Sequence, residues 1–171
     1  MNTTRQMLFL YIVLSIITVS ACKNEAKTGA PEPETREVRE NYGTGELSRV
    51  YNRVNGKIEG KMVDYYPSGA IKGERYFKDD KQEGKTTIFY ENGAVKEVQY
   101  YIGGLKNGGD TLFYEGGKLQ DVSEFKDDKK NGYLRKWDED GGLVYEAKFA
   151  MDSLVEVEGK AITTLQPKTK K

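Results

Sequence analysis

The side chains in this chain that could do chemistry are acidic, aromatic or a single cysteine. There is no histidine among the 171 residues, and the only cysteine is Cys22. A serine nucleophile therefore has no histidine base to activate it. The glycine-rich stretch GGDTLFYEGG lacks the Lys-Ser/Thr pair and the strand-to-helix context of a phosphate-binding loop. Asp and Glu are abundant, so a carboxylate pair acting as in a glycosidase is the catalytic interpretation left open.

Two acidic pairs are the candidates for a metal site. Asp79-Asp80 and Asp127-Asp128 occupy the same position of a repeating pattern, and Ca²⁺ prefers clustered oxygen ligands. However, the intervening copy has Gly103-Gly104 at this position, no EF-hand spacing follows, and each acidic pair lies between two lysines. We therefore expect solvated turns here, and we predict neither a metal nor another cofactor.

Three tyrosines form the candidate binding surface. Tyr66, Tyr90 and Tyr114 follow one another at intervals of 24 residues. Tyrosine is favoured at binding interfaces, and a row of aromatic rings can stack on a peptide or a sugar. The alternative is that the three rings ladder across neighbouring strands and stiffen a sheet. The sequence leaves both interpretations open.

A 24-residue repeat positions all of these side chains. Its fixed positions are glycines, aromatic residues and an aliphatic residue, and it runs through four copies without insertion or deletion. They are Gly60, Gly84, Gly108 and Gly132; Tyr65, Phe89, Phe113 and Trp137; Gly69, Gly93, Gly117 and Gly141; Ile71, Val95, Leu119 and Leu143; and Phe77, Tyr101, Phe125 and Phe149. Self-similarity at a fixed period is typical of repeat architectures, whose units stack on their neighbours.

Each copy predicts a β-hairpin. Its parts are a short first strand, a turn with glycine, a longer second strand and a polar connection. The first strands are expected at 61–66, 85–90, 109–114 and 133–138, the second at 71–78, 95–102, 119–126 and 143–149, and the connections at 79–84, 103–108 and 127–132. Asn92-Gly93 and Asp140-Gly141 favour primed hairpin turns, and the recurring glycines disfavour helix.

The predicted fold is all-β, an elongated single-layer antiparallel sheet of stacked β-hairpins. Such a sheet offers no deep pocket that could exclude water or shift a pKa, so we predict that the protein is not an enzyme. Ile71 and Phe77 are six residues apart, so strand parity places them on one face, together with Tyr65. Tyr66, Tyr90 and Tyr114 are then expected on the other face.

Residues 1–21 predict a signal peptide. Arg5 supplies a basic start, residues 7–19 are an apolar run, and Ser20-Ala21 are small. The apolar run is short for a helix that crosses a hydrocarbon core ~30 Å thick. The alternatives are a general secretory signal with an incidental cysteine and an uncleaved anchor.

The end of this segment resembles the lipobox of bacterial lipoproteins. The residues that carry the resemblance are Val19, Ser20, Ala21 and Cys22. It implies cleavage before Cys22 and acylation of the Cys22 sulfur and amine, so we expect a membrane anchor in a bacterial cell envelope. The next residue is Lys23 rather than Asp, which favours the outer membrane by the sorting rule known for such lipoproteins.

The rest of the chain divides by composition. Residues 22–41 begin with the lipidated cysteine and are rich in charge and proline, which predicts a flexible tether. Residues 42–155 hold the repeats, with a worn first copy, and residues 156–171 hold a capping strand and a basic tail. The net charge is zero, so there is no general positive surface, and we predict no nucleic-acid partner.

The repeat resembles the bacterial variant of the MORN repeat, over about residues 42–149. The resemblance rests on GKMVDYYPSGAIKGERYFK and GKTTIFYENGAVKEVQYY. It implies stacked β-hairpins in an elongated sheet and a role in scaffolding and protein contacts. This variant is typical of proteins labelled as YwqK-family antitoxins, which implies a toxin as the partner.

Three functions follow from these observations. The leading hypothesis is a membrane-anchored envelope lipoprotein that presents a β-repeat scaffold for binding a protein or another envelope component. The alternative is an antitoxin or immunity-type protein that neutralises a partner toxin. The third hypothesis is a carbohydrate-active enzyme.

Overall fold

The computed structural model describes residues 32–158 and 160–161. Within them the chain forms thirteen β-strands, and no helix there is long and apolar enough to cross a membrane. The strands are β1 Thr35–Asn41, β2 Leu47–Val54, β3 Lys57–Tyr65, β4 Ile71–Lys78, β5 Lys81–Gln82, β6 Gly84–Phe89, β7 Val95–Ile102, β8 Leu105–Phe113, β9 Leu119–Lys126, β10 Lys129–Trp137, β11 Leu143–Ala150, β12 Ser153–Val157 and β13 Lys160–Ala161.

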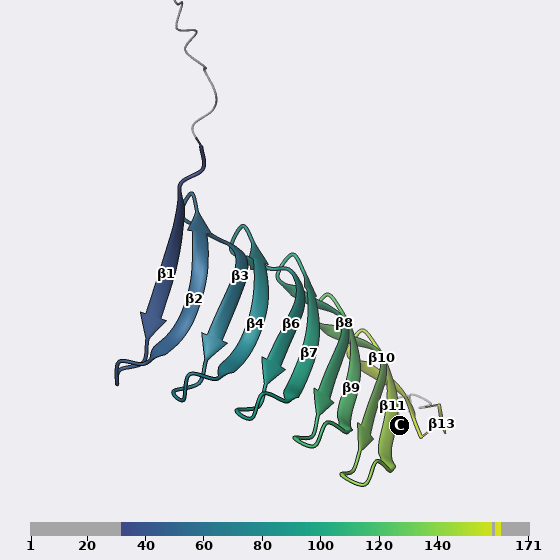
Figure 1. Cartoon of the computed structure of the whole chain (residues 1–171). Helices are drawn as coiled ribbons and strands as arrows, with labels where there is room; N and C mark the ends of the chain where they lie inside the picture. The colour runs from purple at the N-terminus through teal and green to yellow at the C-terminus, as the bar shows by residue number, and fades with distance from the viewer. Residues whose placement is uncertain (1–31, 159, 162–171) are drawn as a thin grey trace, which may run out of the picture. The chain divides into compact units, whose positions relative to one another are not determined.

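The strands form one antiparallel sheet in which each strand lies beside its neighbour in sequence (Figure 1). The order is β1-β2-β3-β4-β6-β7-β8-β9-β10-β11-β12-β13, and the two-residue β5 pairs with β4. At ~4.8 Å between strands, this ribbon is about 50 Å long. The predicted all-β fold, an elongated antiparallel sheet of stacked β-hairpins, is confirmed.

The sheet extends at both ends beyond the four clear copies of the repeat. β1 occupies Thr35–Asn41, the last part of the segment predicted as tether, and it pairs with β2 in an antiparallel register. The many charged residues of β1 do not prevent it from forming a strand, because an edge strand leaves most of its side chains in water. At the other end, β12 and β13 continue the sheet beyond β11, where a capping strand is expected.

The second strand of each hairpin lies where the repeat predicts it. β4, β7 and β9 agree residue for residue with the predicted ranges, and β11 extends one residue further to Ala150. The primed turns predicted at Asn92-Gly93, before β7, and at Asp140-Gly141, before β11, are wrong, because in each pair only the glycine has a positive φ. Tyr90 accepts a hydrogen bond from the Gly93 N–H, and Gly93 has a positive φ of 86°, whereas Asn92 does not. This geometry is a three-residue loop that ends in a left-handed glycine.

Primed turns occur instead at the opposite edge, where polar loops are predicted. Asp79 and Asp80 have φ values of 51° and 66°, and Asp127 and Asp128 have 51° and 65°. Positive φ at both central residues is the signature of a two-residue type I′ turn. The connections are therefore two residues long rather than six. The strands that follow begin early, so β3, β8 and β10 are nine residues long and the prediction of short first strands is wrong.

Hydrogen bonds also join an aspartate of each of these tight turns to the main chain of the preceding hairpin. Asp128 donates its N–H to the Lys106 carbonyl at 2.9 Å, and its Oδ1 accepts the Lys106 N–H at 2.7 Å. The same pair of bonds joins Asp80 to Ile58 and Asp152 to Lys130. Aspartate tolerates positive φ and brings its own acceptor, so these acidic residues fasten the edge of the ribbon.

A β-bulge in each hairpin decides which side chains share a face. Asp64 pairs with Gly73 and Tyr65 pairs with Ile71, so Lys72 is an extra residue on β4. Asp64 and Tyr65 are successive residues of β3 and point to opposite faces, which places Ile71 on the face opposite Asp64. The same register shift recurs in the three later hairpins.

The bulge makes the predicted face wrong for Phe77, whereas Ile71 and Tyr65 share a face opposite the tyrosine column, as predicted. Phe77 alternates in step with Gly73, so it lies on the face of Asp64, while Ile71 lies on the other. The tyrosine column lies on the Asp64 face as well. Tyr42 and Tyr114, which hold the column's position in their hairpins, line hollows together with Asp64 and with Asp121. The parity argument fails because it assumes an uninterrupted second strand.

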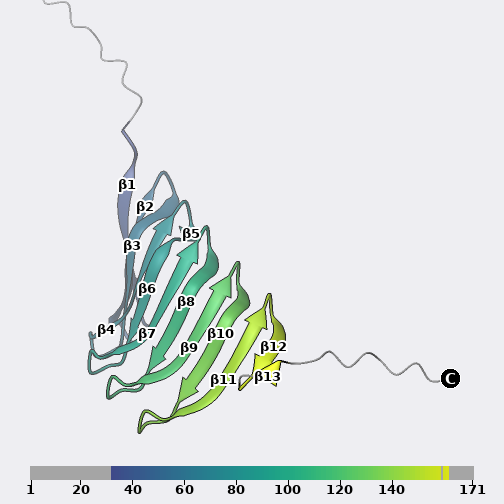
Figure 2. The ribbon, with the colours of Figure 1, turned by 90° about the vertical axis from the view of Figure 1, so that its right-hand side faces the viewer.

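All strongly buried side chains lie on the Asp64 face, which we call the inner face. They are Tyr51, Met62, Asp64, Thr86, Asp110, Ser123, Leu134 and Ala147. In a single-layer sheet, side chains become this strongly shielded from solvent only on the face toward which the strands bend. The strands are visibly bent in Figure 2. Half of this thin core is polar, so hydrogen bonds must contribute much of its specificity.

Candidate binding surfaces

The candidate tyrosines bond each hairpin to the next. The Tyr66, Tyr90 and Tyr114 hydroxyls each donate to a main-chain carbonyl 23 residues further on, at 2.7, 2.7 and 2.8 Å. Tyr42 donates in the same way to the Tyr65 carbonyl, at 2.5 Å. The acceptors are the carbonyls of the aromatic residues that end the first strands. The hydroxyls therefore join neighbouring repeats, and contact of the half-buried rings with a partner stays a prediction.

A lysine side chain lies over the ring of Tyr66, and another lies over the ring of Tyr90. Lys72 Nζ lies 5.7 Å from the centroid of the Tyr66 ring, and Lys96 Nζ lies 5.5 Å from that of Tyr90. Both lysines are the extra residue of a bulge, which turns them onto the inner face beside the tyrosine. These distances suit cation–π attraction, so this rim of the inner face combines aromatic surface with positive charge.

The acidic pairs predicted as turns do form turns, as described above. In the described part of the chain, no group of three or more Asp, Glu, His or Cys side chains is arranged to hold a metal ion. Lys57 Nζ lies 2.9 Å from Asp79 Oδ1, so this carboxylate is occupied by an ion pair across the edge.

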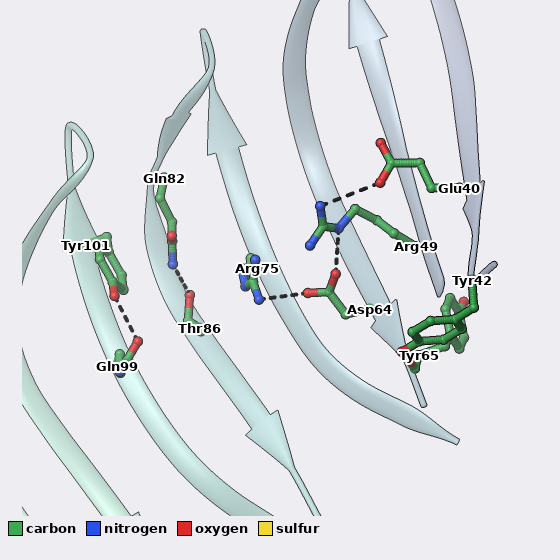
Figure 3. Close-up of polar contacts among 10 residues, drawn as sticks. All are labelled: Glu40, Tyr42, Arg49, Asp64, Tyr65, Arg75, Gln82, Thr86, Gln99 and Tyr101. Carbon is green, nitrogen blue, oxygen red and sulfur yellow. Dashed lines mark hydrogen bonds and ion pairs between the residues drawn. The ribbon is translucent and has the colours of Figure 1, made fainter. Parts of the chain in front are cut away.

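The most ordered polar group on the inner face is an Arg–Asp–Arg cluster (Figure 3). Arg49 Nε donates to Asp64 Oδ1 at 2.6 Å, and Arg75 Nη2 forms an ion pair with Asp64 Oδ2 at 2.9 Å. Arg49 also lies 3.6 Å from Glu40. Asp64 is only 5% exposed, so the two guanidinium groups offset the cost of burying its charge. The hydrogen bond to Asp64 raises the pKa of Arg49 above its ordinary value.

A second polar group lies at the middle of the inner face. Lys106 Nζ is 2.6 Å from Asp110 Oδ2, while the buried Asp110 Oδ1 has no partner among the described residues. Burial, and then the charge of Asp110, raise the pKa of Glu97. A protonated Glu97 would supply the donor that Asp110 Oδ1 lacks. Gln99 donates to Glu97 and accepts from the Tyr101 hydroxyl at 2.9 Å, which fixes this group in place (Figure 3).

Hollows follow the inner face. The first, of about 250 Å³, is lined by Arg49, Asp64, Lys72 and Arg75 together with Glu40, Tyr42, Ser48 and Tyr65. Another, of about 330 Å³, is lined by Tyr114 and residues of β8 to β11. A third, of about 420 Å³, is lined by Lys130, Leu134, Lys136, Tyr145 and Phe149. Within the described residues, the inner face thus offers open polar and aromatic depressions.

The opposite, outer face carries an exposed aliphatic row. Ile71, Val95, Leu119 and Leu143 are 42, 37, 39 and 53% exposed. Each pairs with the aromatic residue that ends the first strand of its hairpin. We call these four pairs the outer row. The sequence predicts that Ile71 shares a face with Phe77, but the bulge places Ile71 on the outer face and Phe77 on the inner face.

Sequence reasoning missed the Arg49–Asp64–Arg75 cluster. A signal was present, because the positions equivalent to Asp64 hold Ile88, Leu112 and Lys136 in the later copies. The repeat does not require an acidic residue at this position, since two of the other copies have an apolar residue there. The predicted lipid attachment at Cys22 lies outside the described residues.

Comparison with known proteins agrees with the hairpin repeat. The model of the MORN repeat variant family matches residues 58–79 and 82–102. No curated protein matches the chain. The two matched segments run from β3 to β4 and from β5 to β7, and the same hairpin recurs through β11. Residues 58–79 and 82–102 are therefore similar to the MORN repeat variant, and the sheet that they belong to is a β-repeat scaffold.

Proposed function

We propose that this chain is a lipid-anchored protein of the bacterial cell envelope whose β-ribbon binds a partner protein. The observation that carries the binding role is the outer row. Four aliphatic side chains, 37–53% exposed and repeated at a spacing of two strands, form a continuous apolar stripe. Contiguous exposed apolar surface of this kind marks interaction sites on soluble proteins.

The outer row has the composition of an interface centre. Its aromatic members are half-buried and supply rigid surface, while the aliphatic members remain open to a partner. The aromatic members are Tyr65, Phe89, Phe113 and Trp137. Charged side chains flank it on the same face, including the Lys61–Glu74 and Arg135–Glu146 pairs at 2.6 Å. An apolar centre with a charged rim favours protein rather than nucleic acid as the partner.

Affinity capture from envelope extracts tests the binding role. The double variant Val95→Asp, Leu119→Asp places two carboxylates in the outer row and should abolish capture. Ser68→Asp, Asn92→Asp adds the same charge in exposed turns and should leave capture unchanged. Capture that survives the first variant would exclude the outer row. A captured toxin whose toxicity is relieved by co-expression would identify the partner class as that of an antitoxin.

The anchor is supported by sequence alone and has its own test. Cys22→Ser should abolish metabolic labelling with an alkynyl fatty acid and move the protein from the membrane to the soluble fraction. Unchanged labelling would show that Cys22 is not the lipidated residue. Because the repeats begin well after Cys22, the variant should leave the unfolding transition of the ribbon unchanged.

A further inference from the structure

The first inner hollow has the construction of an anion site. Two guanidinium groups are held by one buried carboxylate, and each Arg side chain is still about one-third exposed, at 36% for Arg49 and 31% for Arg75. A guanidinium has five N–H donors, and Asp64 and Glu40 occupy only some of them. The remaining donors are available to a ligand in the hollow.

The hollow carries an excess of positive charge. Arg49, Lys72 and Arg75 line it against two carboxylates, Glu40 and Asp64, which leaves one positive charge over. Lys72 makes no ion pair within the described residues and is held over the Tyr66 ring. Part of this charge is removed from bulk water, so it attracts an anion more strongly than an exposed lysine would.

The repeat architecture does not require this cluster. The positions equivalent to Arg75 hold Gln99, Ser123 and Ala147, and the later hairpins form the same register without a guanidinium there. Replacing a buried ion pair by apolar residues is often neutral or stabilising, so stability alone is weak grounds for keeping it. The cluster therefore fits a binding role specific to the first two hairpins.

We propose that this hollow binds an acidic peptide segment of a partner, with a ligand carboxylate held by Arg49 and Arg75 and a neighbouring carboxylate near Lys72. Guanidinium groups bind planar carboxylates through paired hydrogen bonds. Asp64 fixes Arg49 by a hydrogen bond and holds Arg75 by an ion pair alone, since the buried Asp64 Oδ2 accepts no hydrogen bond within the described residues. The hollow opens on the inner face, away from the aliphatic members of the outer row, and Tyr65 is the one residue that lines the hollow and also belongs to that row. The variants that test the two proposals are therefore placed at different residues.

Fluorescence anisotropy with labelled hexaglutamate tests the proposal on the full mature chain. Hexaglutamate should bind at least tenfold more tightly than hexaglutamine at low salt, and inorganic phosphate should not displace it at millimolar concentration. Lys72→Glu should weaken binding at least fivefold. Lys85→Glu makes the same charge change on the outer face and should alter binding less than twofold.

Asp64→Asn separates a ligand site from a purely structural cluster. The substitution keeps the shape and one acceptor for Arg49, and it raises the positive excess of the hollow by one charge. Hexaglutamate should then bind at least threefold more tightly and should raise the Tm of the variant more than that of the wild type. If Asp64→Asn does not fold, the matched Lys72 and Lys85 variants still decide the question.

Three results would overturn the proposal. They are equal affinity for hexaglutamate and hexaglutamine, equal affinity of the Lys72→Glu and Lys85→Glu variants, and displacement by phosphate, which would mean a general anion site. Loss of partner capture through the outer row would leave these measurements untouched, so the two proposals fail separately.

Discussion

Removing the tyrosine hydroxyls should loosen the ribbon by a predictable amount. Tyr66, Tyr90 and Tyr114 each donate one hydrogen bond of 2.7–2.8 Å to a carbonyl of the next hairpin. Tyr→Phe keeps the ring and deletes only the donor. A buried or half-buried neutral hydrogen bond contributes about 0.5–1.5 kcal/mol, so each substitution should cost about 1 kcal/mol.

The losses of stability caused by the three Tyr→Phe substitutions should be additive. The three bonds join different pairs of hairpins and lie one hairpin apart, which is about 9.6 Å at two strand spacings. Effects of sites this far apart with no shared partner are usually additive, so the triple variant should lose about 3 kcal/mol. Urea unfolding followed by circular dichroism measures this directly from the shift in midpoint.

Outer-face tyrosines provide the matched control. Tyr76 and Tyr100 are 45 and 44% exposed, and neither hydroxyl bonds to another described residue. Their double Phe variant should change stability by less than about 0.5 kcal/mol. If the triple inner variant unfolds at the same urea concentration as this control, the hydroxyl bonds contribute nothing and the tyrosine column needs another explanation.

Three further perturbations address the middle of the inner face, the tight turns and the glycine at position 132. The pKa of Glu97 is raised above its ordinary 4.5, so the folded state binds this proton more tightly than the unfolded state. The free energy of unfolding should therefore fall as pH rises from 4.5 through the raised pKa. Glu97→Gln should remove that fall, as measured by urea titrations. Asp128→Ala loses the acceptor for a main-chain N–H at positive φ and should cost about 1–2 kcal/mol, while Asp128→Asn, which keeps both properties, should cost less than half as much in thermal melts. Gly132 has a φ of 130° and an added Cβ would overlap the Glu124 side chain, so Gly132→Ala should cost more than about 1 kcal/mol, whereas Gly109→Ala meets no atom within 4 Å and should change the Tm little. Equal Tm values for the two glycine variants would contradict the requirement for glycine at position 132.

The repeat period predicted the fold because it is set by local residue types. Glycine at fixed positions and alternating apolar residues specify hairpins, and β4, β7 and β9 begin and end where the pattern places them. The turns were harder, because both edges carry residues that accept positive φ. The Asp-Asp pairs form the primed turns, and the Asn92-Gly93 pair does not.

The candidate surfaces were predicted less well, because a bulge changes side-chain direction without changing composition. Lys72 is one added residue on β4, and it places Ile71 and Phe77 of the same strand on opposite faces. The Arg49–Asp64–Arg75 cluster depends on cross-strand register between β2, β3 and β4, which no linear spacing in one strand reveals. Its departure from the repeat was visible, but its contacts were not.

Site-specific photocrosslinking at Leu119 tests whether the outer row binds a partner protein. A photoreactive amino acid replaces Leu119, which is 39% exposed, in the full chain expressed in its membrane setting. The same residue replaces Glu115, in an exposed turn, as the control. We expect one discrete crosslinked protein from position 119 and none from position 115. Identical crosslinking patterns from the two positions, or no crosslink from position 119, would contradict the proposal that the outer row binds a partner protein.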